Sequence, residues 1–296
     1  MTTLRTCASV LLGAVLSFGL GVLDPAREAL GSEQPRRVVS MNLCTDQLAM
    51  LMAAPGQLHS VSDLARDRRS SVLADEAGHF LVNHGLAEEI FTMQPDLILA
   101  GTFTSRASVA MLKRLGFRVE EFPPSDTFDD VRKQIRRVGT LLGRDKRAEE
   151  LVAELDRNLA AASPGVSTHD KRPLVALHYE QSYTAGAGTL ASEVVTHAGA
   201  ENLGSRLGLS GTVRMPLEIL VLAAPDLVVG TSRASPTPAL AEETFDHPAL
   251  RAVIGGRKML FIPDKYWVCG APFTAEAVRI LADAIAPLRT HEATKP

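Results

Sequence analysis

The aromatic side chains of this chain gather on a few short polar segments. Aromatic residues make up only 5% of the 296 residues. All three tyrosines and the single tryptophan nevertheless lie where we expect loops at strand ends: Tyr179, Tyr183, Tyr266 and Trp267. Aromatic rings combine rigid apolar area with a polar edge, which suits the binding of a large chelate or planar ring. The clustering therefore predicts a small-molecule site.

Polar residues on the same and neighbouring loops complete the expected site. Arginine can pair with anionic groups through its planar guanidinium. Arg106 and Arg233 are the stronger candidates, because each follows a strand end by a few residues. The expected ligand contacts are Asn42, Cys44, Thr45, Arg66, Thr102, Arg106, Tyr179, Tyr183, Arg233, Tyr266 and Trp267.

The sequence lacks the patterns of several other functions. It contains no Gly-x-Ser-x-Gly elbow and no His-Glu-x-x-His motif, so we expect no enzyme, with an exported hydrolase as an alternative. The net charge of −3 argues against a strongly basic nucleic-acid binder. His79, His84 and His178 show no spacing of three or four converging ligands, so we expect no metal held directly by side chains.

The N-terminal residues have the pattern of an export signal. Arg5 precedes an uncharged stretch from Cys7 to Leu23, and small residues follow. This pattern predicts a cleavable signal peptide over residues 1–31, the alternative being a membrane anchor.

Short apolar runs alternate with helical patterns along the rest of the chain, which predicts parallel sheets. The expected strands are 37–41, 96–100, 118–122, 173–177, 226–230 and 258–262, and the expected flanking helices are 47–54, 107–115 and 274–288. Residues 127–163 read as helical with a break at Gly143, beginning at a capping box formed by Thr127 and Asp130. We expect lobes at 36–126 and 172–290 with the helical segment 127–163 between them.

The two halves also share local sequence. Glu88 precedes Pro95-Asp96 by the same interval as Glu218 precedes Pro225-Asp226, and an apolar run ending in Gly-Thr follows each Pro-Asp. The repeat predicts one helix–turn–strand unit in each lobe. Because ligands of parallel α/β sheets bind outside the carboxyl ends of the strands, the loops that follow these strands are the expected site.

Taken in order, these motifs resemble the periplasmic solute-binding proteins of ABC importers for ferric siderophores, haem and cobalamin. The carriers are Arg37-Val38-Val39-Ser40, the two Glu…Pro-Asp units, Gly199-Ala200-Glu201-Asn202-Leu203 and the loop at Tyr266-Trp267. The resemblance implies an α/β fold with two Rossmann-like lobes, joined by a single long rigid helix, with the ligand in the cleft between them. It also implies that Glu88 and Glu218 pair with arginines of the importer's permease dimer.

Within this resemblance the ligand stays open. We expect a periplasmic monomer with no covalently bound cofactor that delivers a metal chelate, and a ferric siderophore is slightly preferred over a corrinoid. Haem comes third, and a free-metal carrier is a further alternative.

Cys44 and Cys269 fall on cleft loops of opposite lobes. Export permits a disulfide, but a bond would staple the cleft and hinder ligand access, so we expect two separate thiols.

Overall fold

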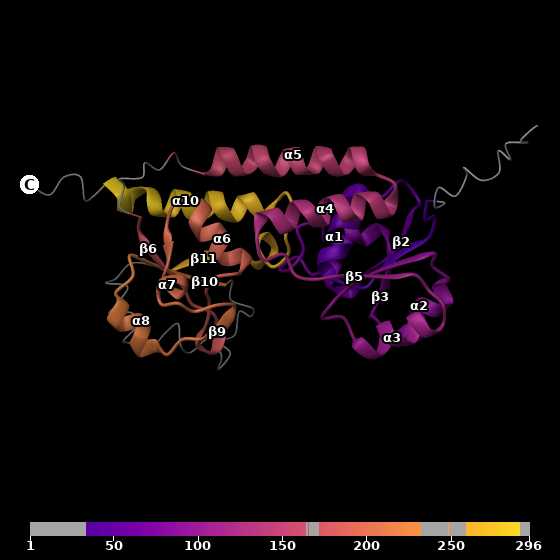
Figure 1. Ribbon diagram of the computed structural model, residues 1–296, viewed down its shortest axis with the longest axis horizontal. Coiled ribbons are helices and arrows are strands. Elements are labelled where there is room, and N and C mark those ends of the chain that lie inside the picture. The colour runs from indigo at the N-terminus through magenta and orange to yellow at the C-terminus, as the bar shows by residue number, and fades with distance from the viewer. Residues whose placement is uncertain (1–33, 164, 166–171, 232–247, 249–258, 291–296) are drawn as a thin grey trace, which may run out of the picture. The chain divides into compact units, whose positions relative to one another are not determined.

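The computed structural model describes residues 34–163, 165, 172–231, 248 and 259–290, which form two α/β lobes (Figure 1). The N-terminal lobe holds a parallel five-stranded sheet in the order β3-β2-β1-β4-β5. Its strands are β1 (Val38–Ser40), β2 (Leu58–Ser62), β3 (Leu81–Asn83), β4 (Leu97–Gly101) and β5 (Val119–Phe122). Its helices are α1 (Leu43–Met52), α2 (Ala87–Met93) and α3 (Arg106–Arg114).

The C-terminal lobe repeats this plan with a four-stranded parallel sheet in the order β11-β10-β6-β8. Its strands are β6 (Leu174–Leu177), β8 (Glu201–Asn202), β10 (Leu227–Thr231) and β11 (Leu260–Ile262). An antiparallel pair, β7 (Tyr183–Ala185) with β9 (Thr212–Arg214), is added beside it. The helices of this lobe are α6 (Leu190–His197), α7 (Leu203–Arg206), α8 (Leu217–Ala223) and α10 (Thr274–Thr290).

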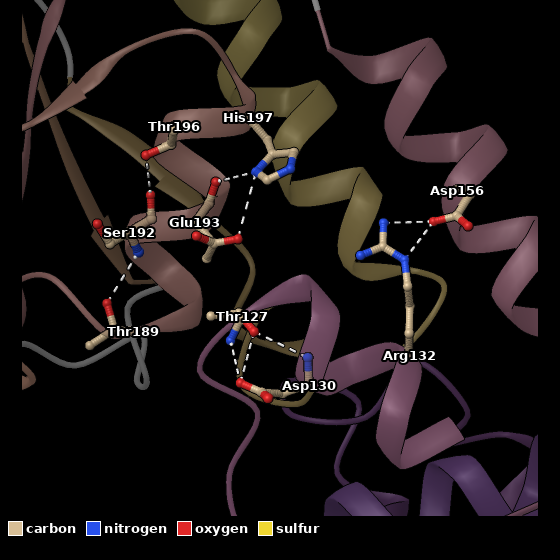
Figure 2. Close-up of polar contacts among 9 residues, drawn as sticks. All are labelled: Thr127, Asp130, Arg132, Asp156, Thr189, Ser192, Glu193, Thr196 and His197. Atoms are coloured by element: carbon tan, nitrogen blue, oxygen red, sulfur yellow. Dashed lines mark hydrogen bonds and ion pairs between the residues drawn. The ribbon is translucent and has the colours of Figure 1, made fainter. Parts of the chain in front are cut away.

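Two helices, α4 (Phe128–Leu142) and α5 (Asp145–Ala162), lie between the lobes in the chain. The expected capping box begins α4: Thr127 and Asp130 exchange side-chain and backbone hydrogen bonds (Figure 2). Gly143 ends it in the left-handed region with φ 67°, where glycine carries no steric penalty. The chain then turns back, and Arg132 on α4 pairs with Asp156 on α5 at 2.7 Å (Figure 2).

One apolar core connects the lobes with these helices. The cluster includes Val38 of β1, Val138 of α4, Leu155 of α5, Val175 of β6 and Leu281 of α10, all fully buried. α5 and α10 contact each other along this core, as Figure 1 shows. At the start of α4, the ring of Phe128 meets the imidazole of His197 on α6 edge to face, with centroids 4.7 Å apart. The lobes are therefore joined by packing as well as by chain connection.

The internal repeat corresponds to one structural unit used twice. α2 and α8 both end on a residue in the left-handed region, Gln94 (φ 47°) and Ala224 (φ 43°), directly before the Pro-Asp pair. The Asp96 carboxylate accepts the backbone N–H groups of Arg36 and Arg37, which lead into β1, and the Asp226 carboxylate accepts that of Leu174 in β6. Each aspartate thus connects its own strand to the neighbouring one.

Most expected elements are present, with shifted ends. The first helix begins at Leu43, so it replaces most of the loop expected before residue 47. The short strands β2 and β3 were missed, because their apolar runs are brief and interrupted by polar residues. The signal peptide falls outside the described residues. In the part of the chain that the structure describes, no helix has the length and apolar character needed to cross a membrane.

Candidate ligand-binding site

A cavity of about 200 Å³ lies where residues of both lobes meet. The N-terminal lobe contributes the residues after β1 and β4 and the end of β5, and the C-terminal lobe contributes the segment after β11. The lining residues are Asn42, Cys44, Gly101, Thr102, Phe103, Phe122, Pro123, Pro124, Ser125, Gln134, Leu190, Trp267, Val268, Cys269 and Gly270. The carboxyl ends of β1 and β4 and the segment after β11 therefore form the site, as the strand-end rule predicts.

Asn42 fixes the geometry of the cavity floor, which we define as the ends of β1 and β4 and the start of α1. Its side chain caps α1 by accepting the backbone N–H of Cys44 at 3.0 Å. Gly101 approaches it so closely that a Cβ there would lie 2.7 Å from Asn42 Nδ2. A larger residue at this position would therefore displace the Asn42 side chain that caps α1.

Aromatic side chains form the walls. Trp267 is 8% exposed and meets the ring of Tyr179 edge to face, with centroids 6.4 Å apart. Burial, with a smaller contribution from the charge of Asp264, raises the pKa of the Tyr179 phenol well above its usual range, so it stays protonated. Phe103, by contrast, is 85% exposed although it lines the cavity.

The expectation of two separate thiols is wrong, because Cys44 and Cys269 form a disulfide. Their Cα atoms are 5.1 Å apart, within the range that a disulfide spans. The segment after β11 comes close enough to the start of α1 to place both cysteines in the cavity wall. The sequence showed both loops at the cleft but not this proximity.

The structure brings four expected contact residues to the cavity: Asn42, Cys44, Thr102 and Trp267. Thr45 lies behind the wall, where it is buried and hydrogen bonded to Ser40 Oγ at 2.8 Å. Arg66 donates to the carbonyl oxygens of Ala77 and Phe80.

Four further expected residues do not line this cavity: Arg106, Tyr179, Tyr183 and Tyr266. Arg106 is exposed at the first position of α3. The Tyr183 ring lies under the Arg214 guanidinium, and the Tyr266 ring lies beside Lys265 Nζ. Arg233 falls outside the described residues.

Several lining residues were not anticipated. Phe103 and Val268 lie on loops already expected at the cleft. Including the apolar residues of those loops among the expected ligand contacts would have identified both. Gln134 is on α4, and Leu190 begins α6. No local signal marks these helical positions as facing a cavity.

Glu88 and Glu218 occupy the same position, the second residue of α2 and of α8, and both are exposed. Each has exposed apolar neighbours: Leu86 and Phe91 near Glu88, and Ile219 and Leu222 near Glu218. The two lobes thus present equivalent surface carboxylates.

The histidines have local roles in the described chain. His84 is exposed, and its hydrogen bond to Glu89 raises its pKa. His178 is buried, and burial lowers its pKa, so it is neutral at pH 7. Among the residues that the structure describes, no three His, Cys, Asp or Glu side chains are grouped as metal ligands would be.

Comparison with known proteins agrees with this architecture. The sequence pattern of the family described as "Periplasmic binding protein" matches residues 38–257. The chain belongs to this family. A cobalamin-binding protein of Halobacterium salinarum is 28% identical over 221 residues, which is 72% of this chain and 58% of that one. The chain thus spans under two thirds of the length of that relative.

Other relatives extend the comparison. The uncharacterized ABC transporter substrate-binding lipoprotein YvrC of Bacillus subtilis is 25% identical to this chain over 264 residues, 86% of this chain and 81% of YvrC. The haem-binding protein RhuT from Roseiflexus superposes with a TM-score of 0.72 at 19% identity, covering 86% of this chain and 99% of RhuT. The vitamin B12-binding protein BtuF of Vibrio cholerae gives 0.64 at 17% identity, covering 86% and 98%. At these identities the solved structures show the shared two-lobe fold.

Proposed function

We propose that this chain is exported, binds a metal chelate and delivers it to an ABC importer. The part of the chelate that enters the cavity is uncharged, and a corrinoid is the simplest ligand of this kind. The observation that carries the proposal is the chemistry of the cavity. Every side chain that the structure places around it is uncharged. A lining without charges disfavours an anionic group, because an ion loses part of its hydration there without gaining a partner.

The polar groups in the wall suit a ligand that carries amides. Asn42 and Gln134 offer carboxamides, and Thr102 and Ser125 offer hydroxyls. Phe103, Phe122 and Trp267 offer flat apolar surface between them. A corrinoid combines a large ring with peripheral amides, so it would use both kinds of surface. The cobalamin-binding relative from Halobacterium supports the same class.

The uncharged lining favours a corrinoid over the ferric siderophore that the sequence slightly preferred. That preference depended on the arginines as well as the aromatic residues, and of the arginine candidates that the structure describes, neither Arg66 nor Arg106 lines the cavity. A neutral ferric hydroxamate remains the second candidate, because it too presents no net charge to the wall. A cavity of about 200 Å³ would hold only one edge of either ligand.

We further propose that Glu88 and Glu218 guide docking on the permease. Exposed charges of this kind mainly accelerate and orient association rather than supply affinity. Their equivalent positions on α2 and α8 suit a partner that has two equivalent subunits.

Calorimetric titration of the purified protein with four ligands tests the ligand class. The panel is cyanocobalamin, a neutral ferric hydroxamate, an anionic ferric catecholate and haemin. We expect saturable binding of cyanocobalamin and no binding of the catecholate or haemin. Saturable binding of an anionic ligand without cyanocobalamin binding would show that the proposed class is wrong.

Variants of one wall residue locate the binding. Phe103→Ala should weaken cyanocobalamin binding by about fivefold to tenfold, since losing one aromatic contact costs about 1 kcal/mol. Phe103→Glu should weaken it further, because it brings a carboxylate to an uncharged wall. Leu207→Ala is the matched control: Leu207 is also an exposed large apolar residue, and it does not line the cavity. An equal loss of affinity in both alanine variants would contradict the assignment of this cavity.

A further inference from the structure

The Cys44–Cys269 disulfide is the covalent link between the two lobes at the cavity. Its cysteines are 225 residues apart in sequence, one on the second residue of α1 and the other after β11. Both line the cavity. The bond therefore joins opposite walls of the candidate binding site.

Each end of the bond is held firmly within its own lobe. On the N-terminal side, Asn42 caps the helix at Cys44, and the next residues, Thr45 and Asp46, are buried. On the C-terminal side, Cys269 is 2% exposed, and its carbonyl accepts the Thr274 hydroxyl at 3.1 Å. Because both cysteines are held in place within their lobes, the bond fixes the distance between the two cavity walls.

The C-terminal end of the bond lies in a segment that also carries the tryptophan. We call residues 264–270 the wall segment. Besides the disulfide, the backbone N–H of Lys265 donates to the Arg69 carbonyl of the N-terminal lobe at 3.1 Å. A Cβ on Gly270 would collide with Val131 of α4, so the segment also lies tightly against that helix. Trp267 is two residues from Cys269 in this segment, and its ring also packs in the apolar core beside Tyr179.

We propose that Cys44 and Cys269 are positioning residues, whose disulfide holds the wall segment against the N-terminal lobe in the arrangement that binds ligand. Binding then depends on the redox state of this pair. The effect on ligand depends on the function proposed above, whereas the placement of Trp267 does not.

Reduction requires an external dithiol, of the kind that thiol–disulfide oxidoreductases carry. Its thiolate attacks the sulfur of Cys44, which is half-buried and lines the cavity, and Cys269 leaves as a thiolate that takes up a proton. The second thiol of the donor then resolves the mixed disulfide. Two electrons and two protons are transferred, which leaves two cysteine thiols here and a disulfide in the donor.

The fluorescence of Trp267 tests the positioning without any ligand, because it is the single tryptophan of the chain. Acrylamide quenching is measured on the oxidised protein, on the protein reduced with a phosphine, and on a Cys44→Ser/Cys269→Ser variant. We expect the quenching constant to rise at least about twofold on reduction, because the indole gains solvent access. The variant should match the reduced protein, and the reductant should not change it. Mass spectrometry confirms that the bond has opened.

Calorimetry with cyanocobalamin on the same three samples measures the effect on binding. Loss of a preorganised wall should weaken binding by about tenfold, and reoxidation should restore it. The Cys44→Ala variant alone should behave as the double variant does, which guards against a folding defect at the buried Cys269.

The outcomes separate the two proposals. Unchanged quenching after verified reduction, or free thiols in protein purified without reductant, would overturn the positioning role. Increased quenching with no binding of cyanocobalamin in either state would support the positioning role and contradict the proposed ligand.

Discussion

At the scale of single residues, the carboxyl group of Asp46, behind the cavity wall, has a strongly raised pKa. Asp46 lies in the first turn of α1 and is completely buried. Burial raises its pKa to about 6, although hydrogen bonds from Ser40 and Ser62 oppose the shift. Keeping Asp46 ionised near neutral pH therefore lowers the stability of the fold. Asp46 is two residues from Cys44 of the disulfide.

This shift predicts a pH dependence of stability with a definite sign. Because the folded pKa lies above the unfolded value, the stabilisation from Asp46 is complete below about pH 4 and disappears as pH rises through about 6. Between about pH 5 and pH 7.5 the contribution falls by roughly 1 kcal/mol. Asp46→Asn should remove that part of the pH dependence, as measured by urea unfolding at both pH values.

The control is Asp126→Asn, the same substitution at an exposed position. An Asp46→Asn protein with the same pH dependence as the parent would show that this carboxyl does not titrate in that range.

At the scale of elements, the repeated helix–turn–strand unit explains how each lobe begins its sheet. The left-handed residue ends the short helix, proline prevents its continuation, and aspartate turns its carboxylate to the start of the neighbouring strand. In the N-terminal lobe, β1 and β4 pair in register from Val38 and Leu97. The aspartate therefore aligns the two strands whose ends form the cavity floor.

Removing that connection should weaken each lobe by a similar amount. Asp96→Ala and Asp226→Ala each delete charge-assisted hydrogen bonds to backbone N–H groups, and each should lower the free energy of unfolding by about 1–2 kcal/mol. Chemical denaturation measures both losses. The control is Asp75→Ala, whose ion pair with Arg68 is exposed and should contribute under about 0.5 kcal/mol. Losses no larger than the control would contradict the connecting role.

At the scale of the molecule, substitution of the two equivalent carboxylates tests delivery to the importer separately from ligand binding. Glu88→Gln/Glu218→Gln should leave the affinity for ligand unchanged, because neither residue lines the cavity. Uptake of the bound ligand by cells that carry this variant in place of the parent should fall about tenfold or more, as expected when docking charges are removed.

The paired control is Glu76→Gln/Glu201→Gln, which removes one exposed glutamate from each lobe elsewhere. Normal uptake with the Glu88/Glu218 variant, or equal loss with the control, would refute the docking assignment.

Several features were determined by the sequence alone, because they depend on neighbours along the chain. The capping box at Thr127, the break at Gly143 and the repeated Pro-Asp unit need only a few adjacent residues, and the structure has all three. Alternating strands and helices likewise indicated two parallel α/β lobes. The strand-end rule then indicated the loops that hold Asn42, Thr102 and Trp267.

Only the tertiary structure decided which of these loop residues meet. Thr45 and Cys44 are adjacent in sequence, yet helical geometry buries one and turns the other to the cavity. Gln134 reaches the site from a helix, and Cys269 forms its bond with a residue 225 positions away. Such contacts depend on how the two lobes pack through α4, α5 and α10, and no local sequence pattern specifies that packing.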